Sequence, residues 1–393
     1  MNRLRKPSDG REARWTNKPL TIDDVKELAR RKVPKLFFDY VDSGAYTEGT
    51  YRANEADFGA IHFRQRVMRD ISARSQASSM MGAPVTMPVA IAPTGSCGMH
   101  WPDGEMRVAE AAEAFGIPFT LSTMSICSIE DVASVRTKPF WFQLYVMTDR
   151  GFVQSLIDRA KAAKCSALVL TVDLQIVGQR HKDIRNDLRS PPKLTLKHLV
   201  QMAARPGWCR RMAGTRRHTF RNVYGHAKGV NDLATLNTWV NEQFDEHLNW
   251  SDVEWIKKRW GGPLIVKGIL DPDDAKAAVE HGADAVIVSN HGGRQLDGAR
   301  SSIFMLPRIV DAVSSQVEVH LDGGIRSGQD VLRALALGAK GVYIGRPYLY
   351  GLGWAGRAGV TSVLDIIERE MDITMGLCGI TRCEQIDQSI LER

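Results

Sequence analysis

A histidine and an arginine stand three residues apart in the run Ser289-Asn290-His291-Gly292-Gly293-Arg294. A histidine can act as a general base near neutral pH, and a guanidinium can hold a carboxylate through two parallel hydrogen bonds. Asp173 can orient His291 and stabilise its protonated form, and Arg180 is a second candidate for binding a carboxylate. A surface loop with a solvated arginine is the alternative, which the flanking glycines disfavour. These residues predict proton abstraction from a small ligand that carries a carboxylate.

A lysine, Lys267, lies inside the apolar run Leu264–Gly268. A buried charge is costly unless it is paired or used. The lysine can serve as a Schiff-base nucleophile or as a fixed charge that faces an electron-rich ring. Spacing alone does not choose between these two roles.

Two glycine-arginine elements predict a phosphate site, with a plain glycine turn as the alternative. Asp322-Gly323-Gly324-Ile325-Arg326 leads into a predicted helix, and Gly345-Arg346 follows another apolar run. Glycines let backbone N–H groups approach an anion, the start of a helix adds its positive end, and the arginines can neutralise charge. A phosphate on a cofactor or substrate is therefore expected.

Eight short apolar runs must position these residues. They are Val85–Ala92, Pro118–Ser122, Phe140–Val146, Ala167–Asp173, Leu264–Gly268, Ala285–Asn290, Val317–Asp322 and Gly341–Gly345. Amphipathic stretches such as Glu105–Phe115 and Gly328–Leu337 separate most of them. Nearly continuous apolar strands separated by helices indicate parallel pairing with both faces covered, and eight such units close into a (β/α)8 barrel of the TIM type in the α/β class.

An open doubly wound sheet is the alternative architecture. The run Gly351-Leu352-Gly353-Trp354-Ala355-Gly356 matches a dinucleotide-binding pattern, but it does not directly follow a predicted strand. We interpret it as a loop with packing glycines. A barrel instead collects function at the carboxyl ends of its strands, and there the sequence is polar at nearly every predicted strand.

The predicted organisation is a single (β/α)8 domain over residues 1–393, with an N-terminal helical extension over 1–80 and a basic insertion over 188–231 after strand 4. The chain carries 52 Lys and Arg against 45 Asp and Glu, a net charge of +7. Ten of those basic residues and no acidic ones lie in 188–231. The other residues are therefore slightly acidic, and the excess charge belongs to the insertion.

The insertion mixes its cations with apolar residues such as Leu199, Val200 and Trp208. This blend is typical of segments that lie on an anionic membrane surface. A solvated loop and a nucleic-acid patch are the alternatives, and we expect no nucleic acid because binding it needs charge but not the apolar residues. No apolar run is long enough to span a bilayer, and no signal peptide is visible. Six cysteines without paired spacing predict no metal site.

Five segments together resemble the family of FMN-dependent α-hydroxy-acid dehydrogenases and oxidases. They are Trp141–Val146, Leu170–Asp173, Val266–Ile269, Ser289–Asp297 and Asp322–Arg326. The likeness is strongest to the membrane-associated L-lactate dehydrogenases of bacteria, also in Lys35–Tyr40 and Ser43–Ala45. The resemblance implies the barrel fold, FMN as cofactor and a homotetramer peripheral to the cytoplasmic side of the inner membrane.

The resemblance also implies roles for individual residues. His291, paired with Asp173, would remove a proton from the substrate, and Lys267 would be a fixed charge at the flavin's pyrimidine edge. The implied catalytic residues are His291, Asp173, Tyr145, Arg294, Arg180 and Tyr40. The implied FMN contacts are Pro93, Thr94, Gly95, Ser122, Gln143, Thr171, Lys267, Ser289, Asp322, Gly323, Gly324, Arg326, Gly345 and Arg346.

The resemblance implies oxidation of an L-2-hydroxy acid, L-lactate to pyruvate first, with electrons passed to a quinone-type acceptor. Gly95 favours a dehydrogenase, because the family's oxidases often carry alanine at that place. Gln175 and Ile176 depart from the lactate pattern, so (S)-mandelate, another aryl or long-chain 2-hydroxy acid, or a glycolate-type oxidase using oxygen are alternatives. A nucleic-acid-binding protein acting through the insertion is the remote alternative from another class.

Overall fold

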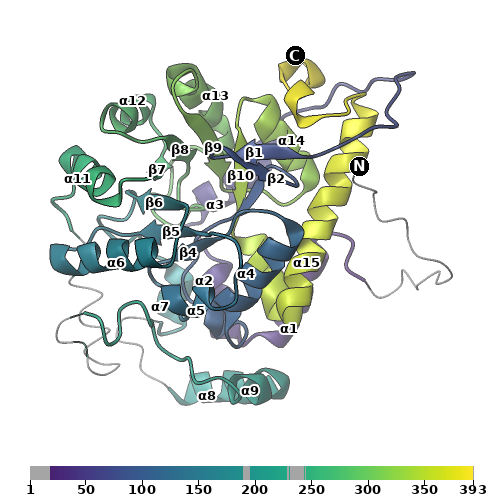
Figure 1. Cartoon of the computed structure of the whole chain (residues 1–393). Coiled ribbons are helices and arrows are strands. Elements are labelled where there is room, and N and C mark those ends of the chain that lie inside the picture. The colour runs from purple at the N-terminus through teal and green to yellow at the C-terminus, as the bar shows by residue number, and fades with distance from the viewer. Residues whose placement is uncertain (1–17, 189–194, 228–229, 231–242, 244, 393) are drawn as a thin grey trace.

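The computed structural model describes residues 18–188, 195–227, 230, 243 and 245–392. Eight parallel strands form a ring in the order β3-β10-β9-β8-β7-β6-β5-β4 (Figure 1). A parallel bridge between Ile91 and Phe119 joins the two ends of this order. The (β/α)8 barrel predicted from the sequence is thus confirmed. The strands are β3 (Val89–Ile91), β4 (Thr120–Ser122), β5 (Trp141–Leu144), β6 (Ala167–Thr171), β7 (Leu264–Ile269), β8 (Ala285–Val288), β9 (Glu318–Asp322) and β10 (Gly341–Ile344).

Helices surround the barrel (Figure 1). Those that follow the strands are α4 (Gly104–Phe115), α5 (Ile129–Ala133), α6 (Arg150–Ala162), α7 (His181–Arg185), α8 (Leu196–Ala203), α9 (Pro206–Met212), α11 (Trp250–Trp260), α12 (Pro272–Glu280), α13 (Ser302–Val313), α14 (Gly328–Ala336) and α15 (Arg346–Leu377). The dinucleotide-like glycine run lies within α15, so the interpretation as a loop was wrong. Its glycines do pack closely: a Cβ on Gly351 would lie 2.5 Å from the Gly359 carbonyl oxygen. The helical backbone breaks only at Ala355 and Gly356.

A hairpin of β1 (Ser78–Met80) and β2 (Ala83–Val85) covers the amino end of the barrel. The predicted first strand, Val85–Ala92, was wrong at its start, because Val85 pairs antiparallel with Ser78. Pro88 lies between the two strands and has no N–H to contribute to a continuous ladder. Met80 of the hairpin is fully buried with Ala90, Trp141 and other inward side chains in a core inside the barrel.

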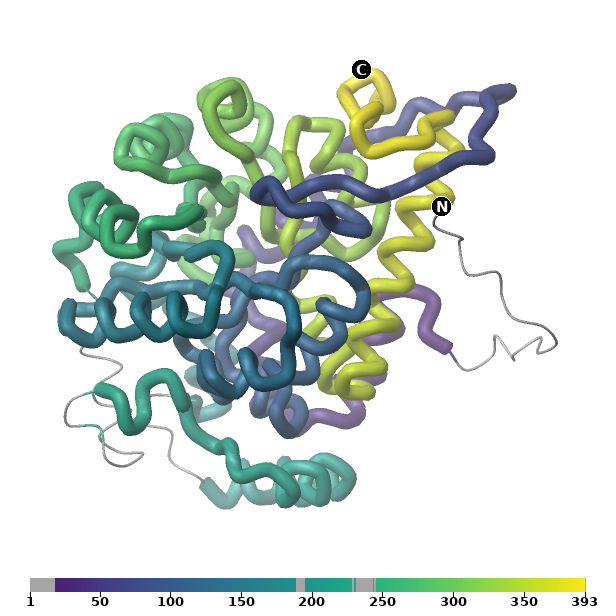
Figure 2. The backbone as a smooth tube through the Cα atoms, in the orientation of Figure 1, coloured from purple at the N-terminus to yellow at the C-terminus, as the bar shows by residue number. Residues whose placement is uncertain are grey.

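The N-terminal helices are α1 (Ile22–Lys32), α2 (Lys35–Val41) and α3 (Gly49–Gly59). Thr21 and Asp24 form a capping box at α1, and α2 begins directly after Pro34. Helix α1 packs along α15, and α3 contacts α13. The stretch after α3 then runs beside the C-terminal segment, where Phe63 bridges Leu391 and Ser75 bridges Arg382 (Figure 2).

Candidate functional site

The His291 ring lies at the carboxyl end of the barrel beside a carboxylate. Its Nδ1 is 2.9 Å from Oδ1 of Asp173, which follows β6. His291 has a φ of +57°, an uncommon value for a residue with a side chain, and its backbone N–H donates to the Ser289 hydroxyl. Burial raises the pKa of Asp173, but His291 and Lys267 outweigh it and hold that pKa below its ordinary value. Asp173 therefore stays ionised and holds the ring through Nδ1, and Nε2 has no hydrogen-bond partner among the described residues.

Gly268 leaves the space that Asp173 occupies. It has a φ of +108°, and a Cβ there would lie 2.7 Å from both Cβ and Cγ of Asp173. The register shift between β7 and β8 falls at the same place, between Lys267 and Ile269. The glycine is thus required both by its backbone angle and by the carboxylate next to it.

Two arginines flank the ring of Tyr40. The guanidinium carbon of Arg294 is 4.9 Å from the ring centroid and that of Arg180 is 5.9 Å away. Nη1 of Arg294 donates to the Tyr40 carbonyl at 2.7 Å, and Nε of Arg180 donates to Asp183 at 2.6 Å. Burial and the nearby Arg180 lower the pKa of Arg294. Two cations held this close favour an anion between them.

Tyr145 lies within electrostatic reach of the whole group. Burial raises the pKa of its hydroxyl, the charge of Asp173 raises it further, and Arg294 and Arg180 lower it. The phenol is therefore protonated and can donate a hydrogen bond. The six residues predicted to be catalytic are thus brought together by the loops after β5, β6 and β8 and by helix α2.

Lys267 on β7 is buried in an ion pair. Its Nζ is 3.0 Å from Oδ2 of Asp322 and 3.0 Å from the hydroxyl of Ser289. Desolvation lowers the pKa of Lys267, but the charges of Asp322 and Asp173 raise it above its ordinary value. The lysine is therefore a permanent cation, which favours the fixed-charge role over the Schiff base.

Unpartnered polar atoms face the same interior. In the described part of the chain, Gln143 Nε2, Thr171 Oγ1 and Asp322 Oδ1 are buried without a hydrogen-bond partner. Ser122 differs, because its hydroxyl donates to Gln143 Oε1 at 3.0 Å. Buried donors and acceptors normally have partners, so these atoms are suited to a ligand that offers both kinds of group.

The predicted phosphate loop is closely packed against α3. Gly324 has a φ of +89°, and a Cβ there would lie 1.8 Å from the Asn54 carbonyl oxygen. Gly323 has a φ of +92°. Arg326 pairs with Glu55 of the same helix at 2.7 Å. The glycines keep their backbone close to α3, and Arg326 is held there by a carboxylate.

Arg346, at the start of α15 directly after Gly345, is buried and bonded to backbone carbonyls. Its guanidinium donates to Val41 at 2.9 Å and to Ser43 and Gly292 at 2.8 and 3.0 Å. It therefore joins the N-terminal segment to the loop that carries His291.

The loop Pro93-Thr94-Gly95 follows β3 and packs against the loop after β4. The Thr94 hydroxyl contacts that of Tyr348. A Cβ on Gly95 would lie 3.0 Å from the Met124 carbonyl oxygen, so an added methyl would press on this second loop.

Several supporting residues were missed by the sequence analysis. Asn54 and Asn290 exchange two side-chain hydrogen bonds of 2.8 Å, which fix α3 to the loop after β8. Ser43 accepts from Arg294 through its hydroxyl and its carbonyl. The partner of Arg180, Asp183, could have been found from its i,i+3 spacing, but long-range pairs leave no such local signal.

The basic insertion has two parts, and its residues 189–194, 228–229 and 231 lie outside the described ones. On α8, Leu196, Leu199 and Val200 are 77%, 52% and 61% exposed. Some polar groups of the later part instead contact the rest of the protein. Arg217 pairs with Asp103 and Asp131, each at 3.0 Å.

Asn222, also in the later part of the insertion, is fully buried and bonds to the segment after β4. Its Nδ2 donates to the carbonyl of Ser122 at 3.3 Å and to the hydroxyl of Ser125 at 3.0 Å. This part of the insertion is therefore a support for the barrel.

Comparison with known proteins identifies relatives over nearly the whole chain. The chain is 46% identical to an L-lactate dehydrogenase of Caulobacter sp. (strain K31), over 94% of this chain and 97% of that protein. It is 45% identical to an L-lactate dehydrogenase of Ectopseudomonas mendocina, over 94% and 97%.

Solved structures agree with this result. A monotopic membrane protein, (S)-mandelate dehydrogenase, superposes with a TM-score of 0.90 at 34% identity, over 95% of this chain and 99% of that one. A soluble mutant of the membrane-associated (S)-mandelate dehydrogenase from Pseudomonas putida gives a TM-score of 0.81 at 34% identity, over the same shares.

The family model described as FMN-dependent dehydrogenase matches residues 29–393. The site fits this cofactor, because a flavin ring carries hydrogen-bond donors and acceptors at its edge and gains negative charge on reduction. Gln143 and Thr171 offer unpartnered atoms to such an edge, and Lys267 offers a buried positive charge. The chain therefore belongs to the FMN-dependent dehydrogenase family and is an FMN-dependent oxidoreductase.

Proposed function

We propose that the enzyme oxidises an L-2-hydroxy acid, L-lactate first, to the 2-oxo acid, and passes two electrons through FMN to a quinone-type acceptor. The observation that carries this proposal is the His291–Asp173 pair at 2.9 Å, gathered with two arginines at the carboxyl end of the barrel. The names of the relatives support the substrate class, because proteins 46% and 47% identical to this chain are L-lactate dehydrogenases.

His291 is the proposed base. Its Nδ1 is engaged by the ionised Asp173, so Nε2 accepts the proton that the substrate loses. The carboxylate then stabilises the imidazolium that forms. FMN supplies a two-electron acceptor when it is bound. Lys267 would offset the negative charge that bound FMN gains on reduction.

Arg294 and Arg180 are the proposed carboxylate clamp. Both lie beside the Tyr40 ring, and the hydroxyls of Tyr40 and Tyr145 are proposed to donate to the substrate's hydroxyl or carboxylate. Arginine forks bind carboxylates with a fixed orientation. The substrate's reacting carbon is then held next to His291 before the proton leaves.

The residues proposed to hold FMN come from several strands of the barrel and from the loops that follow them. Gln143, Thr171 and Ser122 lie on neighbouring strands β5, β6 and β4. The remaining proposed contacts are Pro93, Thr94, Gly95, Lys267, Ser289, Asp322, Gly323, Gly324, Arg326, Gly345 and Arg346. The last five are proposed to hold the phosphate, through backbone N–H groups and the two guanidiniums.

Replacing His291 by glutamine tests the base. The variant should keep bound, yellow FMN, while substrate reduces that FMN about 10²–10⁴-fold more slowly in anaerobic stopped flow. His281→Gln is the matched control, because His281 directly follows α12 at the outside of the barrel. An undiminished rate in His291→Gln would remove the proposed base from the mechanism.

Substrate and acceptor are tested separately. FMN bleaching by L-lactate, glycolate and (S)-mandelate under anaerobic conditions should be fastest with L-lactate. The reduced enzyme should then be reoxidised faster by a soluble quinone than by oxygen. Preference for mandelate would move the assignment toward the solved relatives, and preference for oxygen would make the enzyme an oxidase.

We propose further that the enzyme attaches peripherally to the cytoplasmic side of the inner membrane through α8. Leu196, Leu199 and Val200 give this helix an exposed apolar side, while His198 on the other side is buried. None of the helices in the described ranges combines the length and apolar character needed to cross a membrane. The solved relatives described as monotopic or membrane-associated support surface attachment.

The variant Leu199→Ser/Val200→Ser tests this attachment without removing Asn222 or Arg217. It should bind anionic vesicles less than the wild type in a flotation assay, and its FMN should be reduced by substrate at an unchanged rate. Lys276→Ser, on α12, is a surface control. Equal vesicle binding by wild type and variant would refute α8 as the anchor. The homotetramer stays part of this proposal, to be tested by sedimentation.

A further inference from the structure

Strand β9 places three ionisable residues at alternate positions, Glu318, His320 and Asp322. Alternate residues of a strand point to the same face, and Asp322 meets Lys267 inside the barrel, so all three point inward. The other inward positions are mostly apolar, as in Ala285 and Ile287 of the neighbouring β8. His320 is completely buried. The proposed oxidation uses neither His320 nor Glu318, so their burial calls for another explanation.

The three residues belong to a column of polar groups along the barrel. His320 Nε2 lies 2.9 Å from Oε2 of Glu318, and its Nδ1 lies 3.3 Å from the hydroxyl of Tyr343 on β10. Tyr343 and Asp322 are directly opposite each other in the strand register. Asp322 then reaches Lys267 at 3.0 Å. The column thus has two hydrogen-bonded parts, Glu318–His320–Tyr343 and Asp322–Lys267, which lie next to each other in the strand register.

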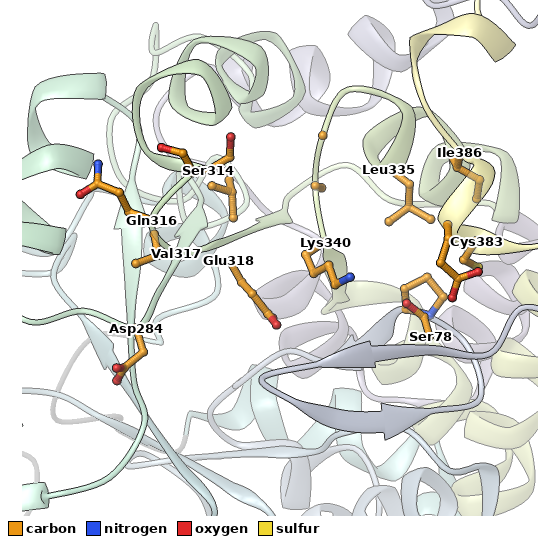
Figure 3. Close-up of a pocket in the computed structure, with 16 residues that line it drawn as sticks. Ser78, Asp284, Ser314, Gln316, Val317, Glu318, Leu335, Lys340, Cys383 and Ile386 are labelled. Atoms are coloured by element: carbon orange, nitrogen blue, oxygen red, sulfur yellow. The ribbon is translucent and has the colours of Figure 1, made fainter.

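The lower end of this column opens into a hollow of about 610 Å³ at the amino end of the barrel (Figure 3). Glu318 and Lys340 line it, together with Asp284 and Glu384. The Glu318 side chain is 26% exposed, whereas His320 is at 0%. Solvent protons therefore reach Glu318 directly and reach His320 through Glu318.

The hydrogen bonds define two protonation states of the column. With neutral His320, Nε2–H donates to Glu318 and the Tyr343 hydroxyl donates to Nδ1. Burial and the charges of Asp322 and Glu318 raise the pKa of Tyr343 well above its ordinary value, so the phenol keeps its proton in both states. With protonated His320, Nδ1–H donates to the Tyr343 oxygen, and the phenol hydrogen turns to another acceptor. In that state the influence of Asp322 on Tyr343 is one of charge, because among the described residues Asp322 Oδ1 has no hydrogen-bond partner.

We propose that His320 is a proton-loading site linked to the redox state of FMN: when two electrons enter the cofactor, His320 binds one solvent proton delivered through Glu318. No covalent bond to the cofactor forms in this step. The electrons come from the reductant, the proton comes from the hollow, and the imidazolium partly balances the negative charge added above Lys267. The linkage is electrostatic and passes through Tyr343, Asp322 and Lys267.

The charged and titratable groups around His320 set the direction of this linkage. Glu318 and Asp322 lie on the same strand as His320. Tyr343 lies on β10, Lys340 directly precedes β10, and Lys267 lies on β7. Burial raises the pKa of the Glu318 carboxyl. The hydrogen bond from His320 is the main influence that outweighs burial and keeps this pKa below its ordinary value. An anionic Glu318 favours protonated His320, and Lys267 opposes it until the cofactor gains negative charge. Reduction therefore favours protonation.

The midpoint potential of bound FMN, measured against pH, tests the proposal. Photochemical reduction of the holoenzyme needs no hydroxy acid, so the result is independent of the proposed substrate. Between about pH 5 and 8, where histidine titrates, the potential of the wild type should fall more steeply with pH than that of His320→Gln. Glutamine keeps a hydrogen-bonding side chain but cannot gain a proton. Identical slopes in the two proteins would overturn the proposal.

Two further variants keep the test decisive if His320→Gln fails to fold or to hold FMN. Glu318→Gln removes the carboxylate that delivers the proton and should also give a shallower slope. Glu384→Gln removes a carboxylate from the same hollow without touching His320 and should behave as the wild type. A pH indicator in weak buffer should record less proton uptake on photoreduction of Glu318→Gln than of Glu384→Gln. Equal uptake by these two variants would refute the column.

Discussion

The two ends of the barrel treat buried polar groups differently. At the carboxyl end, Gln143 and Thr171 keep atoms without partners, and two arginines stand beside one tyrosine ring. At the amino end, Glu318 is bonded both to His320 and to the Met81 N–H of the covering hairpin. The carboxyl end thus keeps polar atoms available for ligands, as expected for this architecture, whereas at the amino end the polar groups of Glu318 and His320 are bonded to the protein itself.

The difference teaches that burial alone does not identify a binding site. His291 and His320 are both histidines next to a carboxylate at 2.9 Å. Only His291 has its second ring nitrogen free for a ligand, because the second nitrogen of His320 faces Tyr343. Unsatisfied hydrogen-bonding capacity thus distinguishes His291 from His320, and the following changes test the contrast between the two ends in order of their expected effect on catalysis.

Asp173→Asn should have the largest effect. The amide cannot stabilise an imidazolium, so the rate of FMN reduction by substrate should fall about 10²–10⁴-fold. Stopped-flow absorbance measures the rate, and Asp284→Asn at the amino end is the matched control. A loss of less than tenfold would mean that Asp173 only positions the ring.

The same variant has a pH signature in stability. The pKa of Asp173 is lower in the folded protein than in the unfolded chain. The ionised carboxylate therefore stabilises the folded state above the ordinary pKa near 4, and this stabilisation is lost as the pH falls from there through the lowered pKa. Denaturant unfolding between about pH 5 and 3 should show a weaker pH dependence in Asp173→Asn than in the wild type. Parallel curves would contradict the depressed pKa.

Gly268→Ala should act through the same carboxylate. The added methyl would meet Asp173 at 2.7 Å, and a displacement of this size can lower kcat/KM by up to about 10²-fold. Gly298→Ala is a matched control, because Gly298 also has a positive φ, +90°, but no neighbour within 4 Å of the added atom. Both variants carry backbone strain, so a similar loss of activity in both would point to strain rather than to Asp173.

Arg294→Lys should weaken substrate binding more than turnover. Lysine keeps the charge but loses the two-pronged contact, and one charge-assisted hydrogen bond corresponds to about 10–100-fold in KM. Steady-state kinetics measure the split between KM and kcat. Arg308→Lys on α13 lies on the surface and should leave both unchanged.

Met80→Ala should leave catalysis unchanged while weakening the fold. Met80 is completely buried at the amino end, so its truncation should reduce the free energy of unfolding by about 2–5 kcal/mol. Met68→Ala is the control, because Met68 is fully exposed. A change in kcat/KM of Met80→Ala measured well below its unfolding temperature would break the functional separation of the two ends.

The sequence predicted the barrel because its signal is local and repeated. Eight apolar runs separated by amphipathic stretches need no knowledge of distant contacts, and all eight contribute to the sheet. The error at Val85 also has a local cause. Val85 is apolar and comes shortly before Pro88, so in the sequence it looks like part of the apolar strand that follows. The error at the glycine run around Gly353 is of the same kind, because glycines that pack closely inside a helix have the composition of a loop.

The candidate site was predictable residue by residue but not contact by contact. The chemistry of His291 and Lys267 follows from residue type and from their place at the ends of apolar runs. The pairing of Asn54 with Asn290 spans 236 positions, and Arg326 with Glu55 spans 271, so no periodicity reveals either. The insertion shows the same limit. Its composition does not reveal that Arg217 pairs with a carboxylate of the rest of the protein whereas Leu199 is exposed.

The contact of α3 with the loop at Gly323 and Gly324 has a consequence for biosynthesis. Helix α3 leaves the ribosome early, whereas the loop that it packs against emerges more than two hundred and fifty residues later. The end of the barrel that we propose binds the FMN phosphate is therefore incomplete in every nascent chain that lacks β9 and β10. We therefore expect the chain to bind FMN only after its last strands have been synthesised and have met its first helices.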